Sequence, residues 1–376
     1  MTFPLLAALA LTLLTVPVVL VLSVVQLVRR RPQRALWRRA GWLHLGLFAV
    51  HLFATFPLTL GYLGSRVMVG TRPPDRPYAG PRLGPDGDLL IQTTRTLRAE
   101  AREGVQVDPA ILAGVAKRTH TVASSDDVTV RLFRVEPRAG TRTRAVAVLV
   151  HGMFRCGVEL EPVTEMLREL GCECWLLELR NHGGSSRAPF TGGIGESDVV
   201  VAGVEYVRAQ PGNDGRPLVL YGVSLGTVAI ALALPRIDGV AAVALDSPID
   251  DLHAAAHRML SFERPGDRRS MFAMTEPWRS LIIGSLGAWS GFRLRDVCPS
   301  DVLATLPPDL PMLLIGGGRD NRAPAVTVER MYERLPMPAA LKDLWIEADG
   351  EHGGMIDSHT AEYRRRLAAL LDRMRR

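Results

Sequence analysis

The stretch PLVLYGVSLG, residues 217–226, runs directly into TVAIALAL, residues 227–234. Its apolar first part is typical of a strand buried on both faces, and the run behind it has the composition of a helix. Gly222 and Gly226 flank Ser224 in a G-x-S-x-G pattern at the junction. A tight strand-to-helix turn needs such glycines, because Cβ atoms there would clash, and it lifts the serine oxygen above the sheet edge. We therefore predict an α/β fold in which Ser224 is a nucleophile.

Two backbone N–H groups near this serine are candidates for binding a developing oxyanion. Leu225 begins the predicted helix, where N–H groups point outward without helical partners. The sequence HGMF follows another buried strand, AVAVLV, residues 145–150. A glycine-containing loop at that place supplies the second donor, which we assign to Met153. His151 and Gly152 are expected to shape this loop, with His151 in a structural role rather than as the base.

The general base and its carboxylate partner are expected on loops after the late strands. His352 lies in the glycine-rich segment ADGEHGG, after the strand LKDLWIE, and is free there to reach the serine. Asp320 lies in GGGRDNRAP after the strand PMLLI, where a carboxylate can hold the imidazole tautomer. Asp246, and less favourably Asp250 or Asp251, are alternatives for the acid. The histidines predicted to be surface or supporting residues are His182, His253, His257 and His359.

Strand and helix patterns alternate through the rest of this region, which predicts a mostly parallel sheet covered on both faces. THTVAS and VTVRLFRV alternate polar and apolar residues and predict an antiparallel pair at a sheet edge. Residues 250–300 interrupt the rhythm with scattered aromatic and methionine residues. They predict a cap or lid, or else a long connection with a small core of its own.

The N-terminus carries two long uncharged runs, residues 1–28 and 40–65, separated by RRRPQRALWRR. Each exceeds the roughly 20 residues that a helix needs to cross the hydrocarbon layer. A signal peptide fits poorly, because no basic residue precedes the first run, and a buried hairpin of this length is unusual in a soluble domain. We predict a two-helix membrane hairpin over residues 1–70.

The arginine-rich connector is expected on the cytoplasmic side, which puts the C-terminal domain on the other, extracytoplasmic side. Residues 71–88 are dense in Pro and Gly and predict an extended linker, followed by the main domain at 89–376. The chain has a net charge of +6, and six of its arginines lie in the short stretch between the two apolar runs, which favours a membrane over a nucleic-acid partner.

The ordered motifs make the chain resemble the α/β-hydrolase superfamily, in particular its esterase, monoacylglycerol-lipase and lysophospholipase-like group. The resemblance covers roughly residues 120–376. That group carries a segment like D-x-R-x-H-G-x-S, which stands here as Glu178-Leu-Arg-Asn181-His-Gly-Gly-Ser185, with Glu for Asp and Asn where Gly is common. Relatives that open epoxides or remove halides use an acidic residue at the position that Ser224 occupies in the strand-to-helix turn, so Ser224 indicates acyl transfer.

The resemblance implies a serine hydrolase of carboxylic esters or thioesters, acting on a small-molecule or lipid substrate without a metal or organic cofactor. A peptidase or acyltransferase of the same fold is an alternative, as is a non-catalytic membrane-bound binding module. A transporter is disfavoured, since the two runs offer no charged path. The four cysteines show no metal-binding spacing. Cys172 and Cys174 are expected to be buried on one face of a strand, or to form a disulfide in an extracytoplasmic domain.

Overall fold

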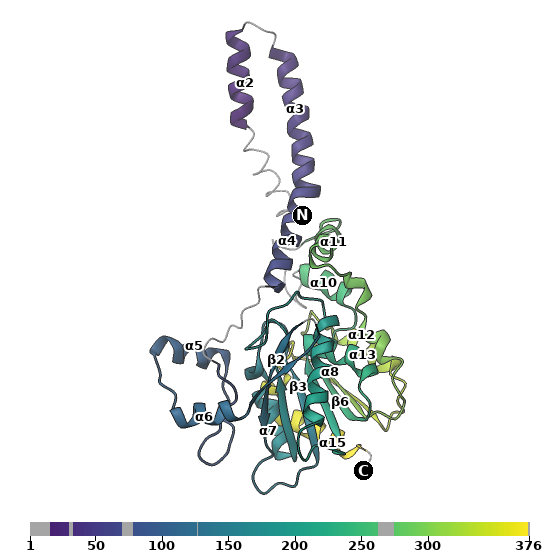
Figure 1. Ribbon diagram of the computed structural model, residues 1–376. Coiled ribbons are helices and arrows are strands. Elements are labelled where there is room, and N and C mark those ends of the chain that lie inside the picture. The colour runs from purple at the N-terminus through teal and green to yellow at the C-terminus, as the bar shows by residue number, and fades with distance from the viewer. Residues whose placement is uncertain (1–15, 30–32, 70–77, 126, 262–273, 375–376) are drawn as a thin grey trace. The chain divides into compact units, whose positions relative to one another are not determined.

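The structure is a computed structural model that describes residues 16–29, 33–69, 78–125, 127–261 and 274–374 (Figure 1). The chain separates into two compact units. The larger unit contains residues 68–255 and 295–376, and the smaller one contains residues 1–67 and 256–294. Each unit is described by itself.

The larger unit is built on an eight-stranded sheet with the order β1-β2-β4-β3-β5-β6-β7-β8. The predicted edge pair is present, since β1 pairs antiparallel with β2, and β2 pairs antiparallel with β4. All other neighbouring strands are parallel, which confirms the mostly parallel sheet. The strands are β1 (Thr119–Ala123), β2 (Thr129–Val135), β3 (Ala145–Val150), β4 (Cys172–Leu177), β5 (Leu218–Val223), β6 (Val240–Asp246), β7 (Met312–Gly317) and β8 (Lys342–Glu347).

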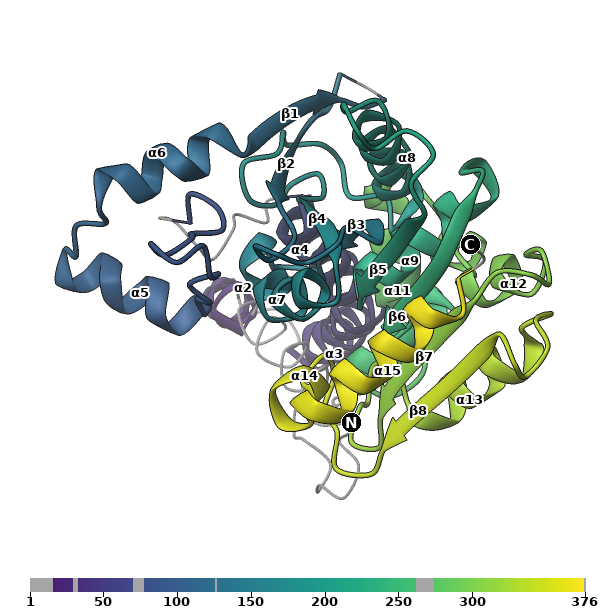
Figure 2. The same ribbon diagram turned by 90° about the horizontal axis from the view of Figure 1, so that it is seen from below.

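Helices cover both faces of this sheet, with α7 and α15 on one face and α8, α9 and α13 on the other (Figure 2). The central strands β3, β4 and β5 are buried along their whole length, as their continuous apolar sequences predict. The helices of this unit are α5 (Thr94–Glu103), α6 (Pro109–Lys117), α7 (Glu161–Glu169), α8 (Ile194–Arg208), α9 (Leu225–Ala233), α12 (Pro299–Leu303), α13 (Ala325–Arg334), α14 (Met355–Ser358) and α15 (Thr360–Asp372), and α10 (Leu252–Ser261) runs from this unit into the other.

The second half of the predicted linker is packed rather than extended. Tyr78 is 7% exposed and meets the ring of Phe133, with the two centroids 5.9 Å apart. Arg82 is also buried and pairs with Glu100 at 3.0 Å. Residues 78–88 therefore belong to the domain, because an aromatic side chain and a paired cation hold them to it; residues 70–77 lie outside the described residues.

The smaller unit contains the apolar N-terminal helices and most of the insertion after β6. These are α2 (Val16–Val28), α3 (Gln33–Val50), a π-helical segment (His51–Thr55), α4 (Phe56–Val69) and α11 (Trp278–Ser290). The segment Gly41–Arg66 runs as one helix from α3 through the π-helical segment into α4. Of the described residues, it is the one helix long and apolar enough to span a membrane. The first predicted span lies partly in residues 1–15, outside the described part. The insertion was expected to belong with the hydrolase domain, whereas residues 256–294 group with the N-terminal helices.

None of the four cysteines, all of which lie in the described residues, forms a disulfide. Cys172 and Cys174 are fully buried in β4, as their apolar surroundings predict, and Cys156 is buried too. Burial raises the pKa of the Cys172 thiol to about 12, which keeps it protonated and unreactive at neutral pH.

Candidate active site

Ser224 lies on the turn between β5 and α9, in a backbone conformation that side chains seldom adopt, with φ 54° and ψ −117°. A Cβ atom at Gly222 would lie 2.8 Å from the Gly226 carbonyl oxygen, and one at Gly226 would strike the Val150 carbonyl. The two glycines are therefore required by close backbone approach. They let β5, the turn and the start of α9 pack against the end of β3.

His352 and Asp320 meet Ser224 from two separate loops. The His352 Nε2 atom lies 2.7 Å from Ser224 Oγ, and its Nδ1 atom lies 2.6 Å from Asp320 Oδ2. An ionised carboxylate can only accept, so Nδ1 carries the proton and Nε2 accepts from the serine hydroxyl. Asp320 is held in turn, because its Oδ1 accepts from the Arg322 and Ala323 N–H groups at 2.8 and 2.9 Å.

Asp246, the main alternative for the acid, has other partners. Its Oδ2 accepts from the Tyr363 hydroxyl at 2.7 Å, and its Oδ1 accepts from Ser247 Oγ at 3.0 Å. The Ser247 hydroxyl oxygen also accepts from the Gly353 N–H at 2.8 Å, next to His352 in sequence. Burial raises the pKa of the Asp246 carboxyl. This network supports the loop that carries His352 through the Gly353 N–H. Among the described residues, no hydrogen bond joins Asp246 to the His352 imidazole.

Three side chains fix the loop at residues 151–154. His151 Nε2 accepts from the Leu179 N–H at 3.1 Å, so its Nδ1 donates to the Gly152 carbonyl at 2.7 Å. Glu159 Oε2 accepts from the Gly152 N–H at 2.7 Å. His182 Nε2 accepts from the Phe154 N–H at 3.0 Å. Burial lowers the pKa of His151 to about 3, which keeps it neutral and suits a structural role.

These contacts leave a donor at the centre of the loop. The Gly152 and Phe154 N–H groups are engaged, while the Met153 N–H has no hydrogen-bond partner among the described residues. The Leu225 N–H is in the first turn of α9, where helical partners are absent. A Cβ on Gly152 would lie 3.2 Å from Ser224 Cβ, so the loop and the serine are neighbours. Both predicted donors thus belong to backbone segments beside Ser224.

Glu159 was not predicted as a support of this loop. Glu159 lies on a short 3-10 turn, Gly157–Leu160, which has no sequence signal of its own. His182 was expected at the surface or in a supporting place, and it is buried, with its Nδ1 donating to the Arg180 carbonyl at 2.8 Å. It belongs to the segment 178–185, in which Asn181 has φ 68°. That angle accounts for Gly being common there, since Asn is among the few other residues that tolerate it.

Glu159 is expected to make stability depend on pH. Burial raises its pKa to about 7, against the opposing effects of the Gly152 N–H and Arg155. The folded state therefore binds the Glu159 carboxyl proton more tightly than the unfolded state. The resulting contribution to the free energy of unfolding is full below about pH 4.5 and is lost as the pH rises through about 7. Glu159→Gln should remove this pH dependence of the stability. The melting temperature of the variant, relative to wild type in the same detergent, should rise between pH 5 and pH 8. An unchanged difference would show that Glu159 keeps an ordinary pKa.

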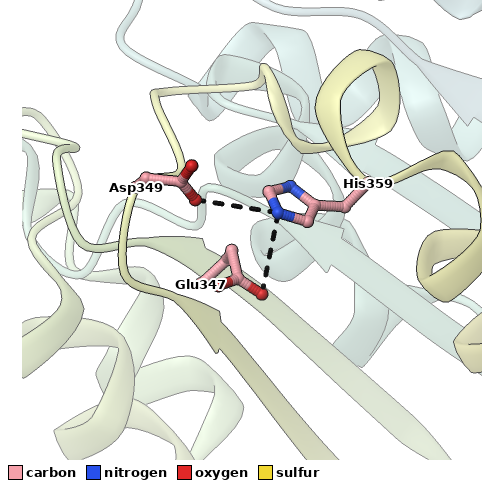
Figure 3. Close-up of side chains that lie close together, drawn as sticks. All are labelled: Glu347, Asp349 and His359. Carbon is pink, nitrogen blue, oxygen red and sulfur yellow. Dashed lines mark ion pairs between the residues drawn. The ribbon is translucent and has the colours of Figure 1, made fainter.

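A second group of ionisable side chains lies at the end of β8 (Figure 3). His359 Nε2 is 3.9 Å from Glu347 Oε2 and 3.7 Å from Asp349 Oδ1. All three side chains are exposed or partly exposed. The arrangement is that of surface side chains in which an imidazole faces two carboxylates, so we assign no metal to it.

The sequence from 147 to 366 matches the model of the alpha/beta hydrolase family, a range that includes Ser224, Asp320 and His352. A search of curated proteins gave no match. The insertion at 250–300, strands β4 to β8 and most of β3 lie inside the matched range, while the apolar N-terminal helices lie outside it.

Several solved structures share the fold. An esterase of Pyrococcus furiosus, Pf2001, has a TM-score of 0.55 at 20% identity, over 68% of this chain and 90% of its own. DcsB, solved with its substrate analogue, has a TM-score of 0.52 at 17% identity, over 68% of this chain and 99% of its own. Est1E of Butyrivibrio proteoclasticus, solved with ferulic acid, has a TM-score of 0.51 at 15% identity, over 68% of this chain and 98% of its own. At these identities the likeness concerns the fold alone.

Proposed function

Because this chain belongs to the alpha/beta hydrolase family, we propose that it is a membrane-anchored serine hydrolase that cleaves a carboxylic ester or thioester. The observation that carries the proposal is the unbroken path from Ser224 Oγ to His352 Nε2 at 2.7 Å and from His352 Nδ1 to Asp320 Oδ2 at 2.6 Å. A nucleophile, a base in hydrogen-bond reach and a third group that orients the base are the parts needed for acyl transfer.

In the proposed reaction, Ser224 Oγ attacks the carbonyl carbon while His352 Nε2 takes the hydroxyl proton. The resulting oxyanion accepts from the Met153 and Leu225 N–H groups, which need no reorganisation. His352 then gives its proton to the leaving alcohol or thiol, and the acyl group stays on Ser224. Water deprotonated by the same histidine attacks the acyl-enzyme, and the released Ser224 takes the proton back. Asp320 stabilises the imidazolium in both halves.

The membrane part of the proposal rests on the apolar helix Gly41–Arg66. Only 17% of its most apolar 18-residue stretch is buried. An apolar helix of this length with most of its surface uncovered suits a bilayer. Arginines precede it in the segment 29–39 and are expected to stay on the cytoplasmic side, which places the hydrolase domain on the extracytoplasmic side.

Two other activities use the same three side chains and differ in the bond cleaved or in the acceptor. A peptidase would cleave an amide, and an acyltransferase would pass the acyl group to an alcohol or amine rather than to water. A non-catalytic binding module is disfavoured by the hydrogen-bonded Ser224–His352 pair, because a scaffold has no need of an aligned base.

The bond specificity is tested with the full chain in detergent and 4-nitrophenyl esters from acetyl to palmitoyl, beside the matching thioesters and 4-nitroanilides. We expect release from the esters or thioesters, with an optimum chain length, and none from the amides. Amide cleavage without ester cleavage would favour a peptidase. An added alcohol that receives most of the acyl group, at the expense of free acid, would favour an acyltransferase.

A further inference from the structure

The insertion helix α11 carries a single charged residue, Arg279 in its first turn, which pairs with Glu276 at 3.5 Å. Trp278, Ile282, Ile283, Ser285 and Leu286 are its buried side. Its exposed side from residue 281 onward consists of Leu281, Gly284, Ala288 and Trp289, and residues 281–292 contain no ionisable side chain. A helix at a protein–water boundary normally carries polar side chains on its outer face, whereas a helix that is apolar all round lies in a core or in a membrane.

The buried side of α11 packs against the apolar helix 41–66 at very short range. A Cβ atom on Gly61 would lie 2.8 Å from the Leu286 backbone nitrogen and would overlap the Ser285 side chain. The two backbones can approach this closely only because Gly61 and Ser285 are both small residues. Close approach through small residues is the usual packing of helices in lipid, where no hydrophobic force drives them together.

A backbone carbonyl at this contact has its hydrogen-bond donor on the partner helix. The helix has a π-helical segment at His51–Thr55, and the Leu52 carbonyl in it accepts from the indole N–H of Trp278 at 3.0 Å. The Phe53 ring stacks on the Trp278 ring, with centroids 5.9 Å apart. A wide helical turn frees a carbonyl, and hydrocarbon offers nothing to bind it, so an indole donor from a partner helix meets that need.

The outer surfaces of the two helices join into one apolar surface. Trp289 of α11 meets Tyr62 edge to face, with ring centroids 5.2 Å apart, and both rings remain more than 40% exposed. Along the length of helix 41–66 the exposed apolar side chains are Trp42, Leu43, Leu45, Val50, Phe53, Leu58 and Leu63. Isolated apolar side chains are ordinary at a surface, but a continuous set of this kind marks an interaction site.

We propose that α11 enters the hydrocarbon layer of a lipid bilayer together with helix 41–66, as one membrane-embedded unit. The proposal rests on the membrane anchoring proposed above and adds that the insertion after β6 is part of the membrane structure. The lipid bilayer is the partner, because the surface is apolar, spans a whole helix and includes Trp and Tyr, which suit the membrane interface.

The test uses the full chain with Cys298→Ser in vesicles of phosphatidylcholine that carries bromine on its acyl chains. A fluorescent nitrobenzoxadiazole label is attached at Leu281→Cys on α11, at Leu45→Cys on helix 41–66, or at Val326→Cys, a matched exposed aliphatic position on α13. The three other native cysteines are buried, and the chain without an added cysteine is the labelling control. We expect quenching at positions 281 and 45 and none at 326.

Quenching at 45 with none at 281 would overturn the proposal and leave the anchor standing. No quenching at either position would overturn both the proposal and the membrane anchoring. Labelling of the same samples by a fluorophosphonate reports on the hydrolase activity separately, so its loss or presence decides nothing about the lipid contact.

A matched pair of variants tests whether the helices enter together. Gly61→Leu puts a side chain into the contact with Ser285 and Leu286, whereas Gly46→Leu lies on the same helix with nothing within 4 Å of its Cβ position. Gly61→Leu should remove the quenching at 281 and keep it at 45, and Gly46→Leu should change neither. Full quenching at 281 in Gly61→Leu would contradict a joint unit.

Discussion

Replacing Ser224 by alanine should lower kcat by about 10⁶-fold on the best ester of the acyl series. The loss is this large because no acyl-enzyme can form, and what remains is catalysis by the oxyanion-binding N–H groups and by substrate binding. The variant keeps a Cβ atom at a position with φ 54°, so its backbone meets the same strain as in wild type. We therefore expect the melting temperature to change little.

The control for this variant is Ser247→Ala. Ser247 also has a positive φ, of 51°, follows the neighbouring strand β6, and accepts from the Gly353 N–H. Its loss should disturb the histidine loop without removing the nucleophile, so a measurable part of the activity should remain. Ester hydrolysis by Ser224→Ala at a rate within tenfold of wild type would mean that another group attacks the substrate.

Asp320→Asn should lower kcat by about 10⁴-fold with a small effect on folding. An amide in place of Oδ2 can donate to His352 Nδ1, which favours the tautomer whose Nε2 carries the proton and therefore cannot accept from Ser224. The binding of substrate should change little, since the carboxylate is fully buried behind the imidazole. Steady-state kinetics should thus show the loss in kcat rather than in KM.

Asp246→Asn separates the two candidate acids. Asp246 binds the Tyr363 and Ser247 hydroxyls, and an asparagine oxygen can accept from either of them. We expect less than a tenfold loss of kcat and a lower melting temperature, because a buried network is disturbed. A loss of about 10⁴-fold in Asp246→Asn, together with an active Asp320→Asn, would assign the acid to Asp246.

The meeting of Ser224, His352 and Asp320 was predictable because each follows a strand of one parallel sheet. The carboxyl ends of parallel strands meet at the same edge, so a serine after β5, an aspartate after β7 and a histidine after β8 arrive together. Sequence pattern alone left Asp246 open as well, since it ends β6 at the same edge. Only the side-chain directions, seen in the hydrogen bonds, separate the two aspartates.

The supports of the 151–154 loop and the packing of α11 could not be predicted in this way. Glu159 reaches Gly152 through a short 3-10 turn, which has no periodicity to reveal its direction. The contact between Gly61 and Ser285 joins segments far apart in sequence, and hydropathy patterns report where a helix is apolar, not which helix covers it. Tyr78 was hidden for a similar reason, because a Pro- and Gly-rich composition predicts a linker even where one aromatic ring is buried.

The serine mechanism is tested by locating the adduct of a fluorophosphonate on the full chain in detergent. After reaction and proteolysis, mass spectrometry should find the phosphonyl group on the peptide that contains Ser224, with no adduct in Ser224→Ala and slow labelling in Asp320→Asn. A folded wild-type protein that takes no label, or that carries it on a residue other than Ser224, would contradict the proposed nucleophile and with it the hydrolase mechanism.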